Sequence, residues 1–174
     1  LVVIKLAVLV RVINLSKACI WHDEGFSVML ASRGFLEIWT GSARDVHPPL
    51  YYELLHFWSE LFGNSVFALR SLSVVAGLGV VALGMIITKK IAGKNTALLA
   101  GILLALSPFL VRYSQEARMY GVLGVFLLLA ILGVIYIVEN PNRWLGYVLY
   151  ALAVTAGLYT HYFTALAVLA IWLY

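Results

Sequence analysis

Side chains that could take part in chemistry occur in four short segments of the sequence. Each segment borders very apolar runs, and together they supply carboxylates, imidazoles, a phenol and an arginine. Charged groups at the edge of a membrane span are costly, so they are functional candidates by default. The start of a helix beside acidic side chains could also hold an anion such as a phosphate. The candidate residues are Asp23, Glu24, Asp45, His47, Tyr113, Glu116, Arg118 and His161.

Each of these features has a simpler explanation when it is taken alone. Adjacent Asp23 and Glu24 fit a solvated loop pair, because exposed carboxylates are common. His47 precedes two prolines and fits a turn, and Glu116 lies between two arginines that could pair with it. A lone histidine such as His161 is more often structural than a ligand. Three separate turns that bring acidic, basic and imidazole groups to one side favour a functional site.

The composition indicates a membrane protein. The chain has 174 residues, of which 63% are hydrophobic, and its mean hydropathy is +0.98. A soluble domain of this size cannot bury so much apolar surface in one core, whereas a bilayer accepts it. The net charge of +4 is explained by loop charges that set topology, and it does not suggest nucleic acid binding. Cys19 is the single cysteine, so no internal disulfide can form.

Apolar runs of the right length predict an all-α, polytopic transmembrane bundle. A helix needs about 20 apolar residues to cross the hydrocarbon. We expect one membrane domain over 1–174, the N-terminal part of a longer protein, with an outer loop at about 14–65. The expected spans lie at about 1–13, 66–88, 96–113, 119–138, 144–160 and 162–174.

The outer loop is expected to carry short interfacial helices. Glu53, His56 and Glu60 fall on one narrow stripe of a helix predicted over Leu50–Phe62. This amphipathic pattern with aromatic residues is typical of a helix that lies in the membrane surface. We interpret the polar stripe as its solvated face. Pro48 and Pro49 suit the first turn of this helix, because proline lacks the N–H that would be unpaired there.

Positive charges indicate the orientation. The short loop 89–94 contains three lysines, so it is expected in the cytoplasm. The loop 139–144 lies two spans later and belongs to the same side. The opposite side then holds the loop 14–65 and the turns at 113–119 and 159–162. The candidate residues therefore face outside the cytoplasm.

Five motifs, in the same order along the chain, resemble a known enzyme class. They are WHDEGFS at 21–27, DVHPPLYY at 45–52, LFG with FALR at 61–70, YSQEARMY at 113–120 and LYTHYF at 158–163. With them the chain resembles the membrane-embedded glycosyltransferases of the GT-C class. The similar group is family 39-like: protein O-mannosyltransferases, the aminoarabinose transferase of lipid A and the Rgt-like bacterial enzymes.

The resemblance implies a glycosyltransferase that uses a polyprenyl-phosphate-linked sugar. By this resemblance Asp23 is the general base, and Glu24 is an orienting or metal-associated carboxylate. Asp45 and His47 match the region where related enzymes hold substrate or a divalent cation. The acceptor would be a lipid, a glycan or a protein. The further substrate-binding candidates are His47, Tyr113, Glu116, Arg118 and His161.

The implied chemistry fits these residue types. The acceptor must lose a proton as it attacks the anomeric carbon, which needs a carboxylate in reach. The leaving lipid phosphate could be stabilised by Arg118, Arg112, a helix N-terminus or a divalent cation. The resemblance also favours a prokaryotic plasma membrane, with the active site outside the cytoplasm.

Two other readings of the same residues remain. A transporter or flippase would use such groups to line a pathway, but it would place them near the middle of the membrane. A non-catalytic membrane scaffold would have no use for Asp23. The position of the polar residues relative to the spans distinguishes a transporter from an enzyme. Replacement of Asp23 distinguishes a scaffold from an enzyme, because only the enzyme should lose activity.

Overall fold

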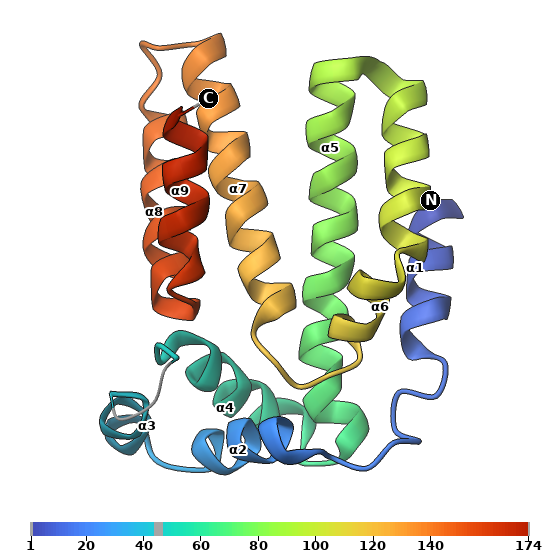
Figure 1. Ribbon diagram of the computed structural model, residues 1–174, viewed down its shortest axis with the longest axis vertical. Coiled ribbons are helices and arrows are strands. Elements are labelled where there is room, and N and C mark those ends of the chain that lie inside the picture. The colour runs from blue at the N-terminus through green and yellow to red at the C-terminus, as the bar shows by residue number, and fades with distance from the viewer. Residues whose placement is uncertain (1, 44–46, 174) are drawn as a thin grey trace.

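A computed structural model describes residues 2–43 and 47–173, and in this part of the chain all regular structure is α-helical (Figure 1). Long helices run side by side, and shorter ones cross one end of them. The helices are α1 (Val2–Val12), α2 (His22–Ala31), α3 (Phe35–Ser42), α4 (Leu50–Phe62), α5 (Val66–Leu106), α6 (Pro108–Ser114), α7 (Tyr120–Glu139), α8 (Trp144–Thr160) and α9 (Phe163–Leu173). An all-α membrane protein was predicted, and this is confirmed.

The first long helix, α5, folds back on itself at Gly93. Gly93 has φ 82° and ψ 176°, a conformation that residues with a Cβ rarely adopt, and it divides α5 into two antiparallel arms. The break falls in the basic segment that was expected to link the spans at 66–88 and 96–113. A single glycine therefore produces the chain reversal at the place where the sequence predicted a loop.

The second arm of α5 does not continue to residue 113. Proline disfavours helical backbone at the residue before it and lacks an N–H to donate. Ser107 accordingly leaves the helix at φ −56° and ψ 118°, and its hydroxyl accepts a hydrogen bond from the Leu110 N–H at 3.5 Å. The short helix α6 begins at Pro108, so the run at 96–113 is two helices rather than one.

Arg11 fastens α1 to this break. Its side chain is fully buried, and it donates to the carbonyls of Leu104 at 3.2 Å and Ala105 at 2.9 Å. Pro108 has no N–H with which to pair the Leu104 carbonyl four residues earlier, so the guanidinium supplies the missing donor. The Nε of Arg11 also donates to the Ser114 hydroxyl at 3.2 Å. A charged residue inside an apolar helix thus has a structural use here.

Gln115 completes the attachment of α1. Its amide nitrogen donates to the carbonyls of Arg11 at 3.1 Å and Ile13 at 3.0 Å, which lie at the C-terminal end of α1. Gly77 on α5 makes room for this junction, because a Cβ there would collide with the Ser114 hydroxyl and lie 3.1 Å from the Arg11 Nε. Gly77 thus allows the close approach of α1, α5 and α6 at this junction.

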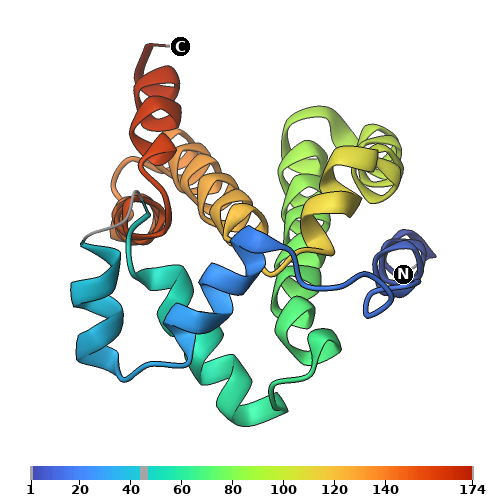
Figure 2. The ribbon, with the colours of Figure 1, turned by 60° about the horizontal axis from the view of Figure 1, so that its bottom comes forward.

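The outer loop is mostly helical. In Figure 2 the helices α2, α3 and α4 lie across one end of the long helices. The helix predicted over Leu50–Phe62 is confirmed with the same bounds. The stripe on α4 is less uniform than predicted, since the His56 ring contacts the Ala31 carbonyl at 2.8 Å, whereas Glu60 is largely exposed. Asp23 and Glu24 lie in the first turn of α2 rather than in an irregular loop.

A hydrophobic core joins these crossing helices to the long ones. Met119 is a fully buried member of this core, together with residues from α4, α5 and α7. Its other fully buried members include Tyr51, Tyr52 and Leu55, all from α4. The core therefore covers the turn between α6 and α7, and it holds that turn against the outer helices.

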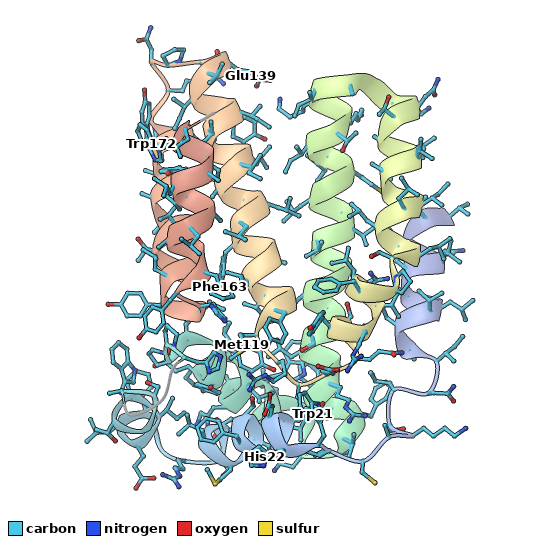
Figure 3. The ribbon with its side chains drawn as sticks, in the orientation of Figure 1. Trp21, His22, Met119, Glu139, Phe163 and Trp172 are labelled. Atoms are coloured by element: carbon cyan, nitrogen blue, oxygen red, sulfur yellow. The ribbon has the colours of Figure 1, made fainter. Side chains whose placement is uncertain are left out.

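The loops expected on opposite sides of the membrane lie at opposite ends of the helices. At one end of the bundle, the Lys90 ammonium pairs with Glu139 at 2.9 Å, which joins the two loops expected in the cytoplasm. At the other end, the turn at 115–119 contacts α2, and His161 contacts His47. Figure 3 shows this separation, with Glu139 at one end and Trp21, His22 and Met119 at the other.

Two helices of the described chain are long and apolar enough to cross a membrane. They are α5, with a mean hydropathy of 2.2 over its best window, and α7, with 2.9. The helices α8 and α9 are apolar but shorter. The exposed apolar side chains that these helices carry along their length suit contact with lipid.

The Arg11 junction can be tested with Arg11→Met. Loss of the guanidinium leaves two buried carbonyls without donors, which costs on the order of 1–3 kcal/mol for each unpaired group. We expect a lower midpoint of thermal unfolding in detergent and faster proteolysis near α1. Lys5→Met is the matched control, because Lys5 is exposed on the same helix. Equal stability of the two variants would show that α1 does not depend on Arg11.

Candidate active site

A buried ion pair between Glu24 and Arg70 forms the base of the site. The Glu24 side chain is 0% exposed, and Arg70 is almost as deeply buried. The guanidinium donates twice, from Nε to Oε1 at 2.8 Å and from Nη2 to Oε2 at 2.7 Å. This two-point geometry is the strong form of an arginine–carboxylate contact. The pair connects α2 to the beginning of α5.

Arg70 also holds the segment that leads from α1 to α2. Its remaining donors reach three backbone carbonyls: Leu15 at 2.7 Å, Ala18 at 3.0 Å and Cys19 at 3.1 Å. All five guanidinium N–H groups are thereby used. Sequence reasoning missed Arg70 as a site residue. A signal was available, because Arg70 lies in an apolar stretch where a charge needs a partner.

The Glu24 carboxylate is held in its ionised form. Burial alone would raise its pKa, but the hydrogen bonds from Arg70 and from the Ala117 N–H, at 2.7 Å, outweigh it and lower the pKa. Both oxygens of Glu24 are therefore occupied by protein donors. This geometry suits positioning of its neighbours rather than proton transfer.

The turn at 115–119 binds to α2 through two successive residues. The Ala117 N–H donates to Glu24, and the Nη1 of Arg118 donates to the Asp23 carbonyl at 3.1 Å and to the Ser27 hydroxyl at 3.3 Å. The acidic turn and the first acidic segment were predicted to lie on one side of the membrane domain, and the structure brings them into direct contact.

Asp23 is held through its backbone while its carboxylate stays open. Its carbonyl accepts hydrogen bonds from Arg118 and from the Ser27 hydroxyl, which lies 3.1 Å away. The side chain is partly exposed. Within residues 2–43 and 47–173, no hydrogen bond or ion pair occupies the Asp23 carboxylate. A fixed backbone with an available carboxylate is the arrangement that a general base requires.

Arg118 is a buried cation without a carboxylate partner among the described residues. Its side chain is 4% exposed, and its Nε is buried without a hydrogen-bond acceptor in this part of the chain. The guanidinium lies 5.8 Å from the centre of the Tyr120 ring. Buried charges are normally paired. An incompletely paired arginine therefore indicates a place where an anion can bind.

Tyr51 adds a second buried donor. Its hydroxyl is fully buried and has no hydrogen-bond partner within the described residues. Burial raises the pKa of Tyr51, and an interaction with the Ser73 side chain and the charge of Arg118 offset this only in part. The phenol stays protonated and can donate. Sequence reasoning missed Tyr51 because an aromatic residue in an amphipathic helix is usually a packing residue.

His161 and His47 lie against each other. Their ring centres are 5.3 Å apart in an edge-to-face contact. The His161 Nδ1 accepts the Phe163 N–H at 3.1 Å, so the proton of the neutral ring is on Nε2. Burial, with the charges of His47 and Arg118, lowers the pKa of His161. His161 is therefore neutral near pH 7.

Aromatic rings continue from His161 toward α6. The Tyr120 ring lies 6.4 Å from His161, and Tyr113 lies 4.6 Å from Tyr120, with both distances taken between ring centres. Tyr113, predicted to bind substrate, thus belongs to the same row as His161. Tyr113 also lines a small cavity of about 80 Å³ between α5, α6 and α7.

Glu116 faces a different part of the structure. Its carboxylate pairs with the Arg112 Nε at 3.2 Å, as one simpler explanation proposed. It lines a cavity of about 300 Å³ that also borders Glu24, Arg70 and Gln115. None of the cavities described for residues 2–43 and 47–173 is lined by Glu116 and His161 together. Asp23, Glu24 and Arg118 lie close together, and His47 and His161 form a second group.

The predicted metal ligands fall only partly within the described structure. Asp45 lies outside the described residues, and His47 lies next to His161. The described residues contain no group of three or more His, Cys, Asp or Glu side chains placed to surround a metal ion.

Glu24→Gln tests the buried pair. The substitution keeps the shape but leaves the Arg70 charge unpaired, which costs about 3–5 kcal/mol for a buried pair. In the unaltered protein, the lowered pKa of Glu24 stabilises the fold above about pH 4.3, and this stability is lost as the pH falls through the folded pKa. Thermal unfolding against pH should show that loss in the parent and not in Glu24→Gln. Exposed Glu37→Gln is the control, and an equal loss in both variants would contradict the role of the pair.

Comparison with known proteins confirms the resemblance. The model of the family described as dolichyl-phosphate-mannose-protein mannosyltransferase matches residues 46–174, well over half of the chain. The match includes the segments with His47, Arg118 and His161 and begins after Asp23 and Glu24. No curated protein and no solved structure matches the chain. The chain therefore belongs to the dolichyl-phosphate-mannose-protein mannosyltransferase family, and it is a glycosyltransferase of the GT-C type.

Proposed function

We propose that the protein transfers a sugar from a polyprenyl-phosphate donor to an acceptor at the extracytoplasmic membrane face, with Asp23 as the general base. The observation that carries this proposal is the contact between Arg118 and Asp23. The guanidinium donates to the Asp23 carbonyl at 3.1 Å and lacks a carboxylate partner among the described residues. The available cation is thus hydrogen-bonded to the backbone of the residue that carries the available base.

The proposed reaction is a direct displacement. The acceptor hydroxyl or amine attacks the anomeric carbon while its proton passes to the Asp23 carboxylate. The new bond forms between the acceptor atom and the anomeric carbon, and the bond from that carbon to the phosphate oxygen breaks. The electron pair leaves with the polyprenyl phosphate. Attack from the face opposite the leaving group inverts the anomeric configuration.

Arg118 is proposed to bind the phosphate of the donor. As the glycosidic bond breaks, negative charge grows on the phosphate oxygen, and a fixed guanidinium stabilises it with little reorganisation. The unused Nε of Arg118 and the protonated Tyr51 hydroxyl are both donors without partners in the described chain. Glu24 and Arg70 hold the elements that carry Asp23 and Arg118, so we propose a positioning role for them.

His161 and His47 are proposed to contact the sugar or the acceptor. A neutral imidazole with its proton on Nε2 can donate to a sugar hydroxyl, and the lowered pKa of His161 keeps it in that form. The adjacent Tyr120 and Tyr113 rings offer apolar faces to a sugar ring. These contacts would orient the substrate rather than react with it.

The position of the site favours an enzyme over a transporter. A transport pathway needs polar groups near the middle of the membrane. Asp23, Arg118 and His161 instead lie at the end of the bundle that carries α2 and α4. The two loops joined by Lys90 and Glu139 mark the other end, which we assign to the cytoplasm because of its lysines. We propose a multi-pass arrangement with the site outside.

Asp23→Asn tests the base. The amide keeps the size of the side chain but cannot accept the proton, so transfer from a polyprenyl-phosphate sugar should fall by about 10²–10⁴-fold. The thermal midpoint should stay unchanged, because the Asp23 contacts described here use its backbone carbonyl. Glu37→Gln, on the adjacent helix α3, is the control. Full activity of Asp23→Asn would remove Asp23 from the mechanism.

Arg118→Gln tests the phosphate contact. Without the charge, stabilisation of the leaving group is lost, and kcat should fall by about 10²–10³-fold. The exposed Arg33→Gln is the control for a change of net charge. A donor with a better leaving group should be affected less than the natural type of donor. Equal losses with both donors would indicate that Arg118 serves only the fold.

A further inference from the structure

A cavity outside the proposed site lies between the outer helices and α8. It has a volume of about 340 Å³, which is at the lower end of the range for small-ligand pockets. Residues from three helices line it: Trp39 from α3, Glu53 from α4, and Leu152, Ala156 and Tyr159 from α8. No role in the proposed reaction uses these side chains.

Glu53 gives the cavity a negative charge. Its Oε1 accepts a hydrogen bond from the Trp39 indole N–H, which fixes the direction of the carboxylate. Among the described residues, no lysine, arginine or histidine pairs with Glu53. The side chain is partly buried, and a carboxylate in that setting is stabilised by a positive partner. The second carboxylate oxygen of Glu53 is available to a positively charged partner.

Two aromatic rings stand beside this carboxylate. Trp39 and Tyr159 have ring centres 6.0 Å apart, inclined at 53°. Trp39 is 41% exposed and Tyr159 is 47% exposed, so part of each ring is open to a ligand. Tryptophan and tyrosine faces attract cations, and groups of such rings are used to recognise ammonium ligands.

The remaining wall of the cavity is apolar and belongs to α8. Leu152 is 65% exposed, and Ala156 follows one turn later on the same face. In a membrane, this face of α8 meets lipid chains. An occupant therefore needs a cationic head beside Glu53 and an apolar tail along α8.

We infer that this cavity, lined by Glu53, Trp39, Tyr159 and Leu152, binds the head group of a phospholipid that carries an ammonium, such as phosphatidylethanolamine. The ammonium lies against the Glu53 carboxylate and the two rings, and the acyl chains follow α8. The unpaired negative charge favours a cation over a neutral sugar. This inference does not depend on the proposed transferase reaction.

The site can be tested by lipid binding to the full chain in detergent, with native mass spectrometry to count bound lipids and to give apparent affinities. The probes are dioctanoyl-phosphatidylethanolamine, its N-acetyl derivative and dioctanoyl-phosphatidylglycerol. We expect phosphatidylethanolamine to bind at least about 10-fold more tightly than the other two, as expected for loss of one charge-assisted contact. Similar binding of all three lipids would overturn the proposal without any variant.

Two variants locate the binding. Glu53→Gln keeps the shape and removes the charge, and it should abolish the preference for phosphatidylethanolamine. Glu60→Gln on the same helix is the matched control, because its side chain is 63% exposed and lies outside the cavity; it should keep the preference. An unchanged preference in Glu53→Gln, or binding of methyl mannoside that depends on Glu53, would overturn the assignment. An unchanged thermal midpoint shows that the variants are folded.

Discussion

The bidentate pair between Glu24 and Arg70 is the interaction on which the outer half of the structure depends. It joins α2 to α5, and through the Ala117 N–H it also holds the turn between α6 and α7. A buried pair of this kind is stabilising only when its other hydrogen-bonding groups are satisfied. Here backbone carbonyls take the remaining Arg70 donors, so the pair orders three chain segments at once.

The need to pair buried polar groups also explains how α1, α5 and α6 are held together. In an apolar environment every backbone N–H and carbonyl needs a partner within the protein. Pro108 breaks the α5 helix and leaves the Leu104 carbonyl without a donor, and Arg11 from α1 supplies one. Gln115 likewise donates hydrogen bonds to backbone carbonyls at the C-terminal end of α1. Polar residues that look isolated in the sequence are thus partners of specific breaks in the backbone.

Within the described part of the chain, three buried arginines are used in two different ways. Arg11 and Arg70 donate their hydrogen bonds to other groups of the protein, so their role is structural. Arg118 keeps an unpaired Nε beside Asp23, and this difference separates the proposed chemistry from the scaffold that supports it. The family assignment makes the protein a glycosyltransferase. The incomplete pairing of Arg118 indicates where charge develops in the proposed reaction.

The sequence by itself determined the membrane class, the helix Leu50–Phe62 and the gathering of the acidic turns at one end. Hydropathy and periodicity are local properties, and counting apolar runs is enough to assign loops to sides. Only the tertiary structure decided that Glu24 is bound on both oxygens, that Glu116 faces a separate cavity, and that Tyr51 and Arg118 keep unused donors. The contacts of Glu24 with Arg70 and of Arg118 with Asp23 join residues 46 and 95 positions apart along the chain. Because pairing across such separations is set by packing, no local pattern reports it.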